Sequence, residues 1–268
     1  LGFDSLYLIE VLENRTNFAP TYQVRRYDLA AGRLDDQPVV DKSEPGPMNG
    51  NRMTAAPSAD GVWLYSLYTR DTEGPFVHVL NLKDRYAVCV DLPFAAGAGG
   101  AFESGMLWSL ALSPDGRTLY AVNGLLGQVA AIDTQSFEMR SATLPKPAAQ
   151  APGLLARIGR RLFPSAEAKR LIHGGAALSP DGQTLFAVEE QGLAAIATGD
   201  LTLQSQYMAR WPLSSLAVSP DGAALYAVSA ESRTLLRLAL PLAKDAAEPE
   251  RIATKIRPAA IMRVAQDR

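Results

Sequence analysis

Few residues of this chain are of the types that carry out chemistry. Among 268 residues there are two histidines, His78 and His173, and one cysteine, Cys89. The sequence shows no recognisable Ser-His-Asp or Cys-His motif. No CxxC or CxxCH occurs, and no glycine-rich loop follows a strand and opens a helix. We therefore expect no catalytic residue, no cofactor such as haem or nicotinamide, and no metal.

The local patterns around these three residues favour structural roles for two of them. Cys89 lies in the alternating run Ala87–Asp91, which predicts a buried structural thiol in a strand rather than a nucleophile, and a single cysteine excludes an internal disulfide. His78 lies in a similar run and is predicted to be a hydrogen-bonded residue within a strand. His173 precedes two glycines at a strand start, so contact with a ligand and simple exposure both stay open.

Four aspartates recur in one turn motif. The clearest copy is LSPDGRTLYAVN at 112–123; the others are LSPDGQTLFAVE at 178–189, VSPDGAALYAVS at 218–229 and PSADGVWLYSL at 57–67. Proline cannot donate to a central ladder, and Asp-Gly supplies a tight turn because glycine adopts positive φ at little cost. The four aspartates are Asp60, Asp115, Asp181 and Asp221. We expect each of them to accept hydrogen bonds from its own turn, and we do not expect them to converge on one ion.

The turn separates two strands in each copy. An alternating run such as Thr118–Val122 is typical of a strand with one face buried. Further strands are predicted at 128–133 and 138–144. The four aspartates are 55, 66 and 40 residues apart, and the shortest spacing is close to the roughly 40–45 residues of a four-stranded propeller blade. The pattern predicts an all-β β-propeller, with a β-sandwich as the alternative.

The repeat also resembles a known family. The stretch 112–123, followed by VAAID at 129–133, is similar to the YVTN type of β-propeller repeat, a relative of WD-repeat and lactonase-like propellers. The resemblance extends from about Ser5 to Val264; it implies the propeller fold and leaves the function open. The stretches 6–10, 22–34, 64–82 and 87–93 resemble uncharacterised bacterial extracytoplasmic propeller proteins, some of them lipoproteins.

The whole chain, 1–268, is predicted to be one propeller domain. First strands are expected near residues 53, 108, 174, 214 and 259, which gives five readable blades; six or seven follow if N-terminal blades are missing. Residues 6–11 and 22–29 resemble second and third strands, so the strand at 258–264 would complete that blade. Residues 41–52 and 94–104 are predicted loops.

Residues 145–172 depart from the repeat and form a predicted insertion between blades. A Pro/Ala linker leads into LLARIGRRLF, where Leu154, Ile158 and Leu162 recur at helical spacing. Arginines occupy much of the rest of this short predicted helix: Arg157, Arg160 and Arg161. Two interpretations stay open. The helix lies on the propeller, or it contacts an acidic protein, an anionic lipid surface or another subunit.

Propeller sites usually lie at the channel mouth, beside the starts of the first strands. Aligning the repeats places a cationic and aromatic fringe there, which suits an anionic ligand or a protein partner: Arg52, Trp108, His173, Arg210, Trp211 and Arg257. The alternative is that they are ordinary loop residues, with the tryptophans packed between blades. The aligned rows contain no carboxylate, and the adjacent loops offer only Glu44 and Glu103. A metal hydrolase is therefore an unfavourable interpretation, because its metal ion would need several such ligands.

Composition narrows the function further. The net charge is −2 and the pI about 5.8, which argues against nucleic-acid binding. No apolar run is long enough to span a membrane, and the chain does not begin with Met, so a removed export signal or anchor is compatible with it. The leading hypothesis is a non-enzymatic binding or scaffold module in an extracytoplasmic or membrane-associated assembly, with a cytoplasmic location still open. The alternative is a lactonase-like hydrolase acting at the channel mouth, around His173, Arg52 and Glu103.

Overall fold

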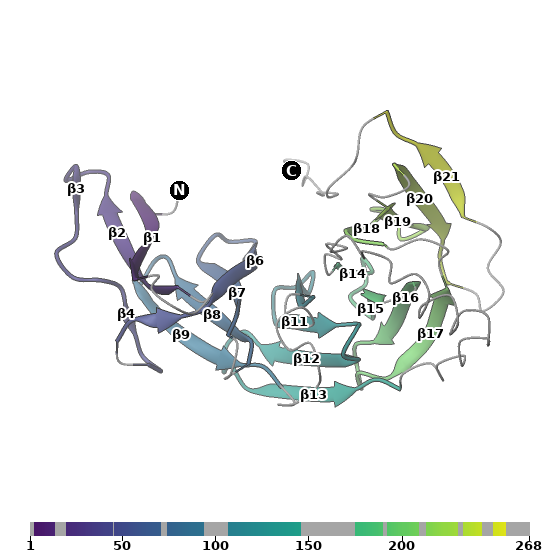
Figure 1. Cartoon of the computed structure of the whole chain (residues 1–268), viewed down its shortest axis with the longest axis horizontal. Coiled ribbons are helices and arrows are strands. Elements are labelled where there is room, and N and C mark those ends of the chain that lie inside the picture. The colour runs from purple at the N-terminus through teal and green to yellow at the C-terminus, as the bar shows by residue number, and fades with distance from the viewer. Residues whose placement is uncertain are drawn as a thin grey trace, which may run out of the picture.

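The structure is a computed structural model and describes residues 3–13, 20–44, 46–70, 74–93, 107–145, 175–189, 192–208, 213–229, 233–242 and 249–255. These residues form strands, turns and loops, with no helix among them and hence none that could cross a membrane. The strands build five sheets arranged as an arc around a common centre (Figure 1). The prediction of an all-β propeller is confirmed.

The sheets are named A to E in chain order. Sheet A contains β1 (Ser5–Glu13), β2 (Thr21–Asp28) and β3 (Arg33–Leu34), with β5 (Met48–Asn49) paired to β2. Sheet B contains, in spatial order, β4 (Val40–Asp41), β9 (Tyr86–Asp91), β8 (Phe76–Asn81), β7 (Trp63–Thr69) and β6 (Asn51–Pro57). Sheet C contains β10 (Ser109–Leu112), β11 (Thr118–Asn123), β12 (Gln128–Asp133) and β13 (Met139–Thr143). Sheet D contains β14 (Ala176–Leu178), β15 (Thr184–Glu189), β16 (Gly192–Ala197) and β17 (Leu203–Met208). Sheet E contains β18 (Leu216–Val218), β19 (Ala224–Ser229), β20 (Thr234–Ala239) and β21 (Glu250–Ala253).

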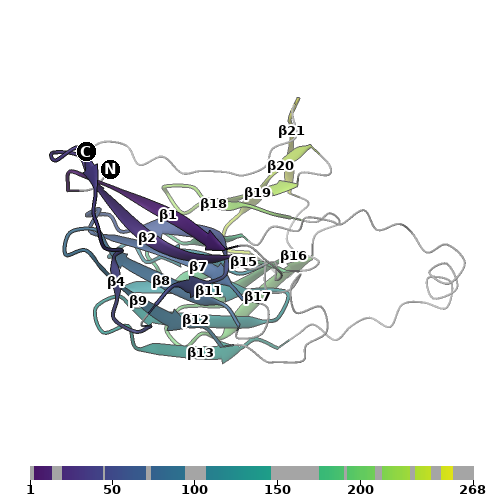
Figure 2. The same cartoon turned by 60° about the vertical axis from the view of Figure 1, so that its left-hand side comes forward.

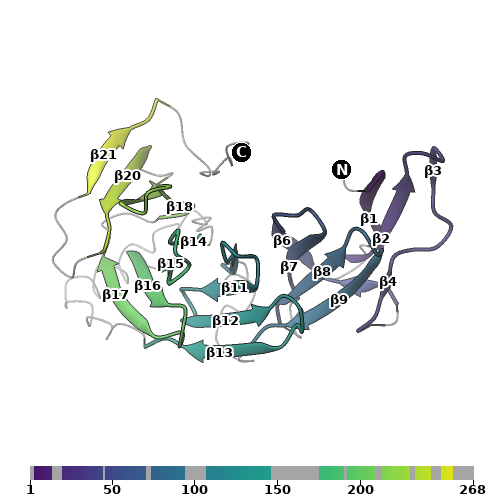
Figure 3. The same cartoon turned by 180° about the vertical axis from the view of Figure 1, so that it is seen from behind.

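Sheets B to E share one topology. Each runs antiparallel from an inner strand outward, and the inner strands β6, β10, β14 and β18 contact one another around the centre of the arc (Figures 1 and 3). Sheet B gains a fifth, outer strand, because β4 pairs in parallel with β9. Figure 2 brings sheet A to the front, with β1 and β2 side by side. Four predicted first strands are thus confirmed, whereas the one near 259 and residues 146–172 of the predicted insertion lie outside the described residues.

The repeated turn is held by hydrogen bonds within the motif itself. In the copy at 113–118, Asp115 Oδ1 accepts from Ser113 Oγ at 2.6 Å and from the Arg117 amide at 3.0 Å. Ser113 Oγ in turn accepts from the Thr118 amide at 2.9 Å. The same bonds occur around Asp60, Asp181 and Asp221. The prediction that each aspartate serves its own turn is confirmed.

The core lies between the sheets rather than inside any one of them. Separate groups of buried side chains join sheets A and B, B and C, C and D, and D and E. Middle strands therefore have neighbours on both faces, and every residue of β8 is buried. The prediction that runs such as 118–122 have one buried face is wrong: Leu119 to Val122 are all buried, because adjacent blades cover both sides.

Two glycines mark the closest approach of neighbouring blades. A Cβ at Gly124, which follows β11, would lie 2.0 Å from the Val188 carbonyl oxygen of sheet D. A Cβ at Gly175, before β14, would lie 2.2 Å from the Ser214 carbonyl oxygen of the next blade. Only glycine therefore fits without displacing backbone at these contacts.

The predicted loop at 41–52 is only partly irregular. It includes Asp41 of β4, both residues of β5 and the start of β6. Composition suggested a loop because this stretch is rich in Pro, Gly and Asn. The short strands arise from pairing with residues distant in sequence: β4 with β9, and β5 with β2.

We expect Gly124→Ala to destabilise the protein by about 2–3 kcal/mol, because the added methyl group must push two blades apart. The matched control is Gly199→Ala, since a Cβ at Gly199 meets nothing within 4 Å. Urea unfolding of both variants measures the effect. Equal unfolding midpoints for the two variants would contradict the close packing of sheets C and D.

We expect Asp115→Asn to destabilise the protein at neutral pH and to have a smaller effect in acid. The hydrogen bond from Ser113, with that from the Arg117 amide, holds the pKa of Asp115 below its usual 3.8. The charged form therefore stabilises the fold above about pH 4, and this contribution is lost as the pH falls through the folded-state pKa. Unfolding midpoints at pH 7 and pH 3 test this; a constant difference between variant and wild type would contradict it.

Candidate functional site

The inner strands line the centre of the arc and carry almost no charge. Their sequences are NRMTAAP in β6, SLAL in β10, AAL in β14 and LAV in β18. Arg52 is the single charged side chain on these four strands. Most of the remaining side chains are small or aliphatic and half-buried. In the described residues, therefore, the inner strands place no carboxylate or histidine at the channel.

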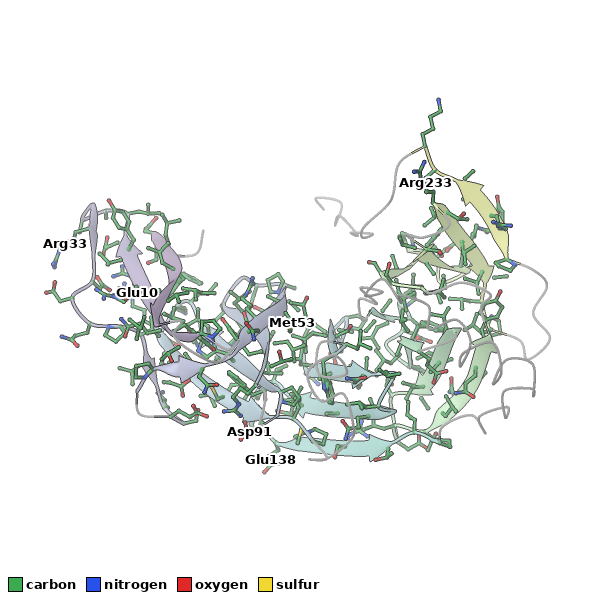
Figure 4. All side chains as sticks on the ribbon, viewed as in Figure 1. Glu10, Arg33, Met53, Asp91, Glu138 and Arg233 are labelled. Atoms are coloured by element: carbon green, nitrogen blue, oxygen red, sulfur yellow. The ribbon has the colours of Figure 1, made fainter. Side chains whose placement is uncertain are left out.

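Arg52 is exposed where it was predicted, at the start of the innermost strand of sheet B. A bulge between Arg52 and Thr54 interrupts the pairing of β6 with β7. Met53 lies within this bulge, on the inner side of the arc (Figure 4). Bulges redirect side chains at sheet edges. This bulge lies directly after Arg52, the only charged residue on the described inner strands. Arg52 is therefore available to an anionic group.

Trp108 lies in the core rather than at a surface. Its side chain is 2% exposed and packs in the group of residues that joins sheets B and C. Its indole nitrogen has no hydrogen-bond partner in the described part of the chain. This burial favours the alternative in which the tryptophan packs between blades, and it removes Trp108 from any face that the other fringe residues share.

The remaining predicted site residues lie outside the described residues. These are His173, Arg210, Trp211 and Arg257 of the fringe, Arg157, Arg160 and Arg161 of the insertion, and Glu103. Their convergence with Arg52 stays a prediction. Glu44 is described, and its carboxylate lies 3.6 Å from the guanidinium of Arg70. It thus has a cationic partner in the residue that follows β7.

A buried polar cluster at the joint of sheets A and B was not anticipated. Asp41 of β4, His78 of β8 and Cys89 of β9 come together there. The Cys89 thiol donates to Asp41 Oδ2 at 3.3 Å, and His78 Nε2 lies 3.8 Å from the same oxygen. The side chains of His78 and Asp41 are only 3% and 5% exposed. His78 and Cys89, which lie 37 and 48 positions after Asp41 in the sequence, thus both contact its buried carboxylate.

Three further residues complete this cluster. Asp41 Oδ1 accepts from the Ser43 hydroxyl at 2.6 Å, from the Ser43 amide at 2.8 Å and from the Glu44 amide at 3.1 Å. Ser43 Oγ accepts from the Cys89 amide at 2.7 Å, which fastens the turn to β9. The Cys89 sulfur also lies 3.7 Å from the Met48 sulfur. Asp41 is therefore the anchor of the segment 41–48.

The electrostatics keep the thiol and the imidazole of this cluster neutral beside an ionised Asp41. Burial raises the pKa of the Cys89 thiol far above its usual value, and the Asp41 charge raises it further. Burial lowers the pKa of His78 to about 4, against the opposing effect of Asp41. Burial also favours the neutral form of Asp41, but hydrogen bonds from Ser43 and Cys89 outweigh it and lower that pKa. At neutral pH Cys89 is a thiol beside a neutral imidazole, which is not an activated nucleophile.

Two predictions for these residues need correction. His78 is an interior-strand residue, but its Nε2 atom has no hydrogen-bond partner in the described chain, so it is not satisfied as expected. Cys89 is half-buried rather than fully buried. The alternating patterns identified both strands, but only the register that pairs His78 with Cys89 and the parallel pairing of β4 bring in Asp41. Nothing in the local sequence predicts that pairing.

Hard-metal chemistry finds little support in the described residues. Among them, no three His, Cys, Asp or Glu side chains are grouped to hold a metal ion. The four turn aspartates belong to four separate turns, each occupied with its own hydrogen bonds.

Comparison with known proteins supports the fold. No protein-family model and no curated protein sequence matches the chain. Among solved structures, it is similar to virginiamycin B lyase from Staphylococcus aureus, with 14% identity over 96% of this chain and 77% of that one and a TM-score of 0.55. It is also similar to a putative 6-phosphogluconolactonase from Bacteroides fragilis, with 16% identity over 93% and 71% and a TM-score of 0.51. A third similar structure, a protein from Lactobacillus plantarum, has 20% identity over 90% and 67% and a TM-score of 0.52.

The chain is a β-propeller protein. Five sheets of mainly antiparallel strands around one centre, together with these similarities, define that class. At such low sequence identities the similarity establishes the fold alone. The chemistry has to be argued from the residues present here.

We expect Cys89 to react with iodoacetamide at least about tenfold more slowly in the native protein than in urea, because its thiolate form is suppressed. Asp41→Asn removes a charge that raises the thiol pKa, so this variant should react faster than the wild type. Mass spectrometry gives one unambiguous signal, since Cys89 is the only cysteine. Equal rates in native and unfolded protein would refute the proposed suppression.

Proposed function

We propose that this protein is a non-enzymatic propeller that binds or organises protein partners through its loops and the 145–172 insertion. The observation that carries the proposal is the composition of the inner strands, which present a single charge, Arg52, and no acid–base pair. A propeller enzyme acting at its channel needs ionisable groups there to move protons or to hold a metal. A rigid propeller that carries variable loops is well suited to bind protein partners.

The nature of the contact follows from charge. Arg52 is exposed at the start of β6, the inner strand of sheet B, and an arginine there favours carboxylate or phosphate groups, which it can bind in a bidentate manner. The predicted fringe residues His173, Arg210, Trp211 and Arg257 would extend this cationic surface. The arginines of the insertion would add a second one, suited to an acidic protein or an anionic membrane surface.

Three finer assignments belong to the same proposal. We infer that the repeats are of the YVTN type, since the turn motif and the VAAID strand match that pattern. The protein would act outside the cytoplasm of a bacterium, as a subunit of a surface or membrane-associated assembly. The resemblance of several stretches to extracytoplasmic propellers supports this location.

The alternative is a hydrolase or lyase acting at the channel mouth. The similar structures include proteins named as a lyase and as a putative lactonase, and their fold is shared with this chain. The exposed Arg52 would then bind an anionic substrate, with His173 and Glu103 as proton-transfer groups. This alternative requires ionisable groups from loops, because the described inner strands supply none besides Arg52.

Removal of the insertion tests the leading proposal. Deletion of residues 153–170 should leave the thermal unfolding of the propeller nearly unchanged and abolish complexes seen by native mass spectrometry of gently purified protein. A variant of unchanged length, with Arg157, Arg160 and Arg161 each replaced by Glu, should do the same if charge carries the contact. Complexes that survive both changes would overturn this role of the insertion.

Charge reversal at the channel mouth tests the second contact. We expect Arg52→Glu to weaken binding of a co-purifying partner about tenfold and to reduce its dependence on salt, because one attractive charge becomes repulsive. Arg33→Glu is the matched control, since Arg33 is an exposed arginine at the tip of sheet A, far from the centre (Figure 4). Equal affinities of the two variants would exclude Arg52 from the interface. A lone protein that turns over lactones, with activity lost in Arg52→Glu, would favour the alternative.

A further inference from the structure

Two sulfur atoms meet at the joint of sheets A and B. β4 pairs with β9, and Met48 of β5, seven positions after Asp41 in the sequence, pairs with Tyr22 of β2. These pairings bring the Met48 thioether within 3.7 Å of the Cys89 thiol. Two sulfurs that each lay about 2.3 Å from one metal ion would be about 3.8 Å apart at a tetrahedral angle. The observed spacing matches that of two ligands on one ion.

A third potential ligand atom, which lacks a hydrogen-bond partner in the described part of the chain, lies beside the same carboxylate. His78 is paired with Cys89 across β8 and β9, and its Nε2 atom is buried and accepts no hydrogen bond in the described part of the chain. It lies 3.8 Å from Asp41 Oδ2, the same oxygen that accepts the Cys89 thiol. A buried ring nitrogen without a partner is costly, and a metal ion is one partner that an imidazole readily takes.

We propose that Cys89 and Met48, with His78 as the third ligand, bind the soft monovalent cation Cu(I). Thiolate and thioether donors select Cu(I), whereas Ca²⁺ and Mg²⁺ require sets of oxygen ligands. The set differs from a conventional group of His, Cys and carboxylate ligands because one donor is a thioether. Asp41 serves the site as a hydrogen-bond acceptor that positions the thiol.

The exchange is balanced in charge. Cu(I) displaces the thiol proton, so the S–H bond breaks, an S–Cu bond forms and one proton leaves. The proton passes first to the Asp41 carboxylate, which already accepts the thiol, and then to water. The buried site has the same net charge before and after binding, so no uncompensated charge is created in the core. As a residue Cys89 is half-buried, so the site lies close to the protein surface rather than deep in the core.

The test uses the whole chain, reduced and free of oxygen, with Cu(I) supplied as its bathocuproine disulfonate complex. We expect the protein to withdraw one equivalent of Cu(I) and to unfold at a higher temperature when loaded. Cys89→Ser should abolish this uptake. Met48→Leu keeps the volume of the side chain, and His78→Gln keeps a polar group; each should weaken the affinity about 10–100-fold. Met139→Leu, at an exposed position of β13, is the matched control and should bind as the wild type does.

Three results would overturn the proposal. They are no uptake of Cu(I) by the wild type, undiminished uptake by Cys89→Ser, and wild-type affinity in both Met48→Leu and His78→Gln. The last result would show an ordinary thiol acting alone. A parallel titration with Zn²⁺ should give weaker binding, and tighter binding of Zn²⁺ than of Cu(I) would likewise refute a soft-cation site. Circular dichroism of each variant confirms that the fold is retained before its affinity is compared.

Discussion

The hydrogen-bonded Ser-Pro-Asp-Gly turn is the constraint on which the rest of the structure depends. One carboxylate oxygen accepts from the serine hydroxyl and from an amide two residues on, and the serine oxygen accepts from the first amide of the next strand. The inner strand and its neighbour therefore start in a defined register in four blades. The turns also touch across blades: a Cβ at Gly182 would lie 3.2 Å from the Pro114 ring. The geometry of each turn therefore also affects how neighbouring blades of the arc meet.

Stacking of blades imposes a second constraint, because both faces of each middle strand are excluded from water. Because neighbouring sheets cover each side of a middle strand, small residues such as Ala121 and Ala130 occur where a larger side chain would hold the sheets apart. The same packing explains why backbone groups meet at Gly124 and Gly175. The inner strands follow the same rule with small or aliphatic residues.

The joint between sheets A and B departs from this regular scheme. Here β4 and β5 come from a segment between blades, and they bring Asp41 and Met48 against Cys89 and His78. A buried carboxylate with four hydrogen-bond donors stabilises this irregular segment. Polar groups in a dry joint are costly unless they are paired, and the hydrogen bonds to Asp41 supply that pairing here. This joint is the one place in the described core where sulfur, imidazole and carboxylate groups meet.

The amino-acid sequence by itself determined the turns, the positions of most strands and the all-β class, because the bonds that make an SPDG turn span no more than five residues. It also identified Arg52 as an exposed charge at a strand start. Only the tertiary structure decided that Trp108 is covered by two sheets and that His78, Cys89 and Asp41 share one buried oxygen. These contacts depend on which blade lies beside which and on the pairing of strands distant in sequence. Periodicity reports which residues of a strand share a face, but not what packs against that face.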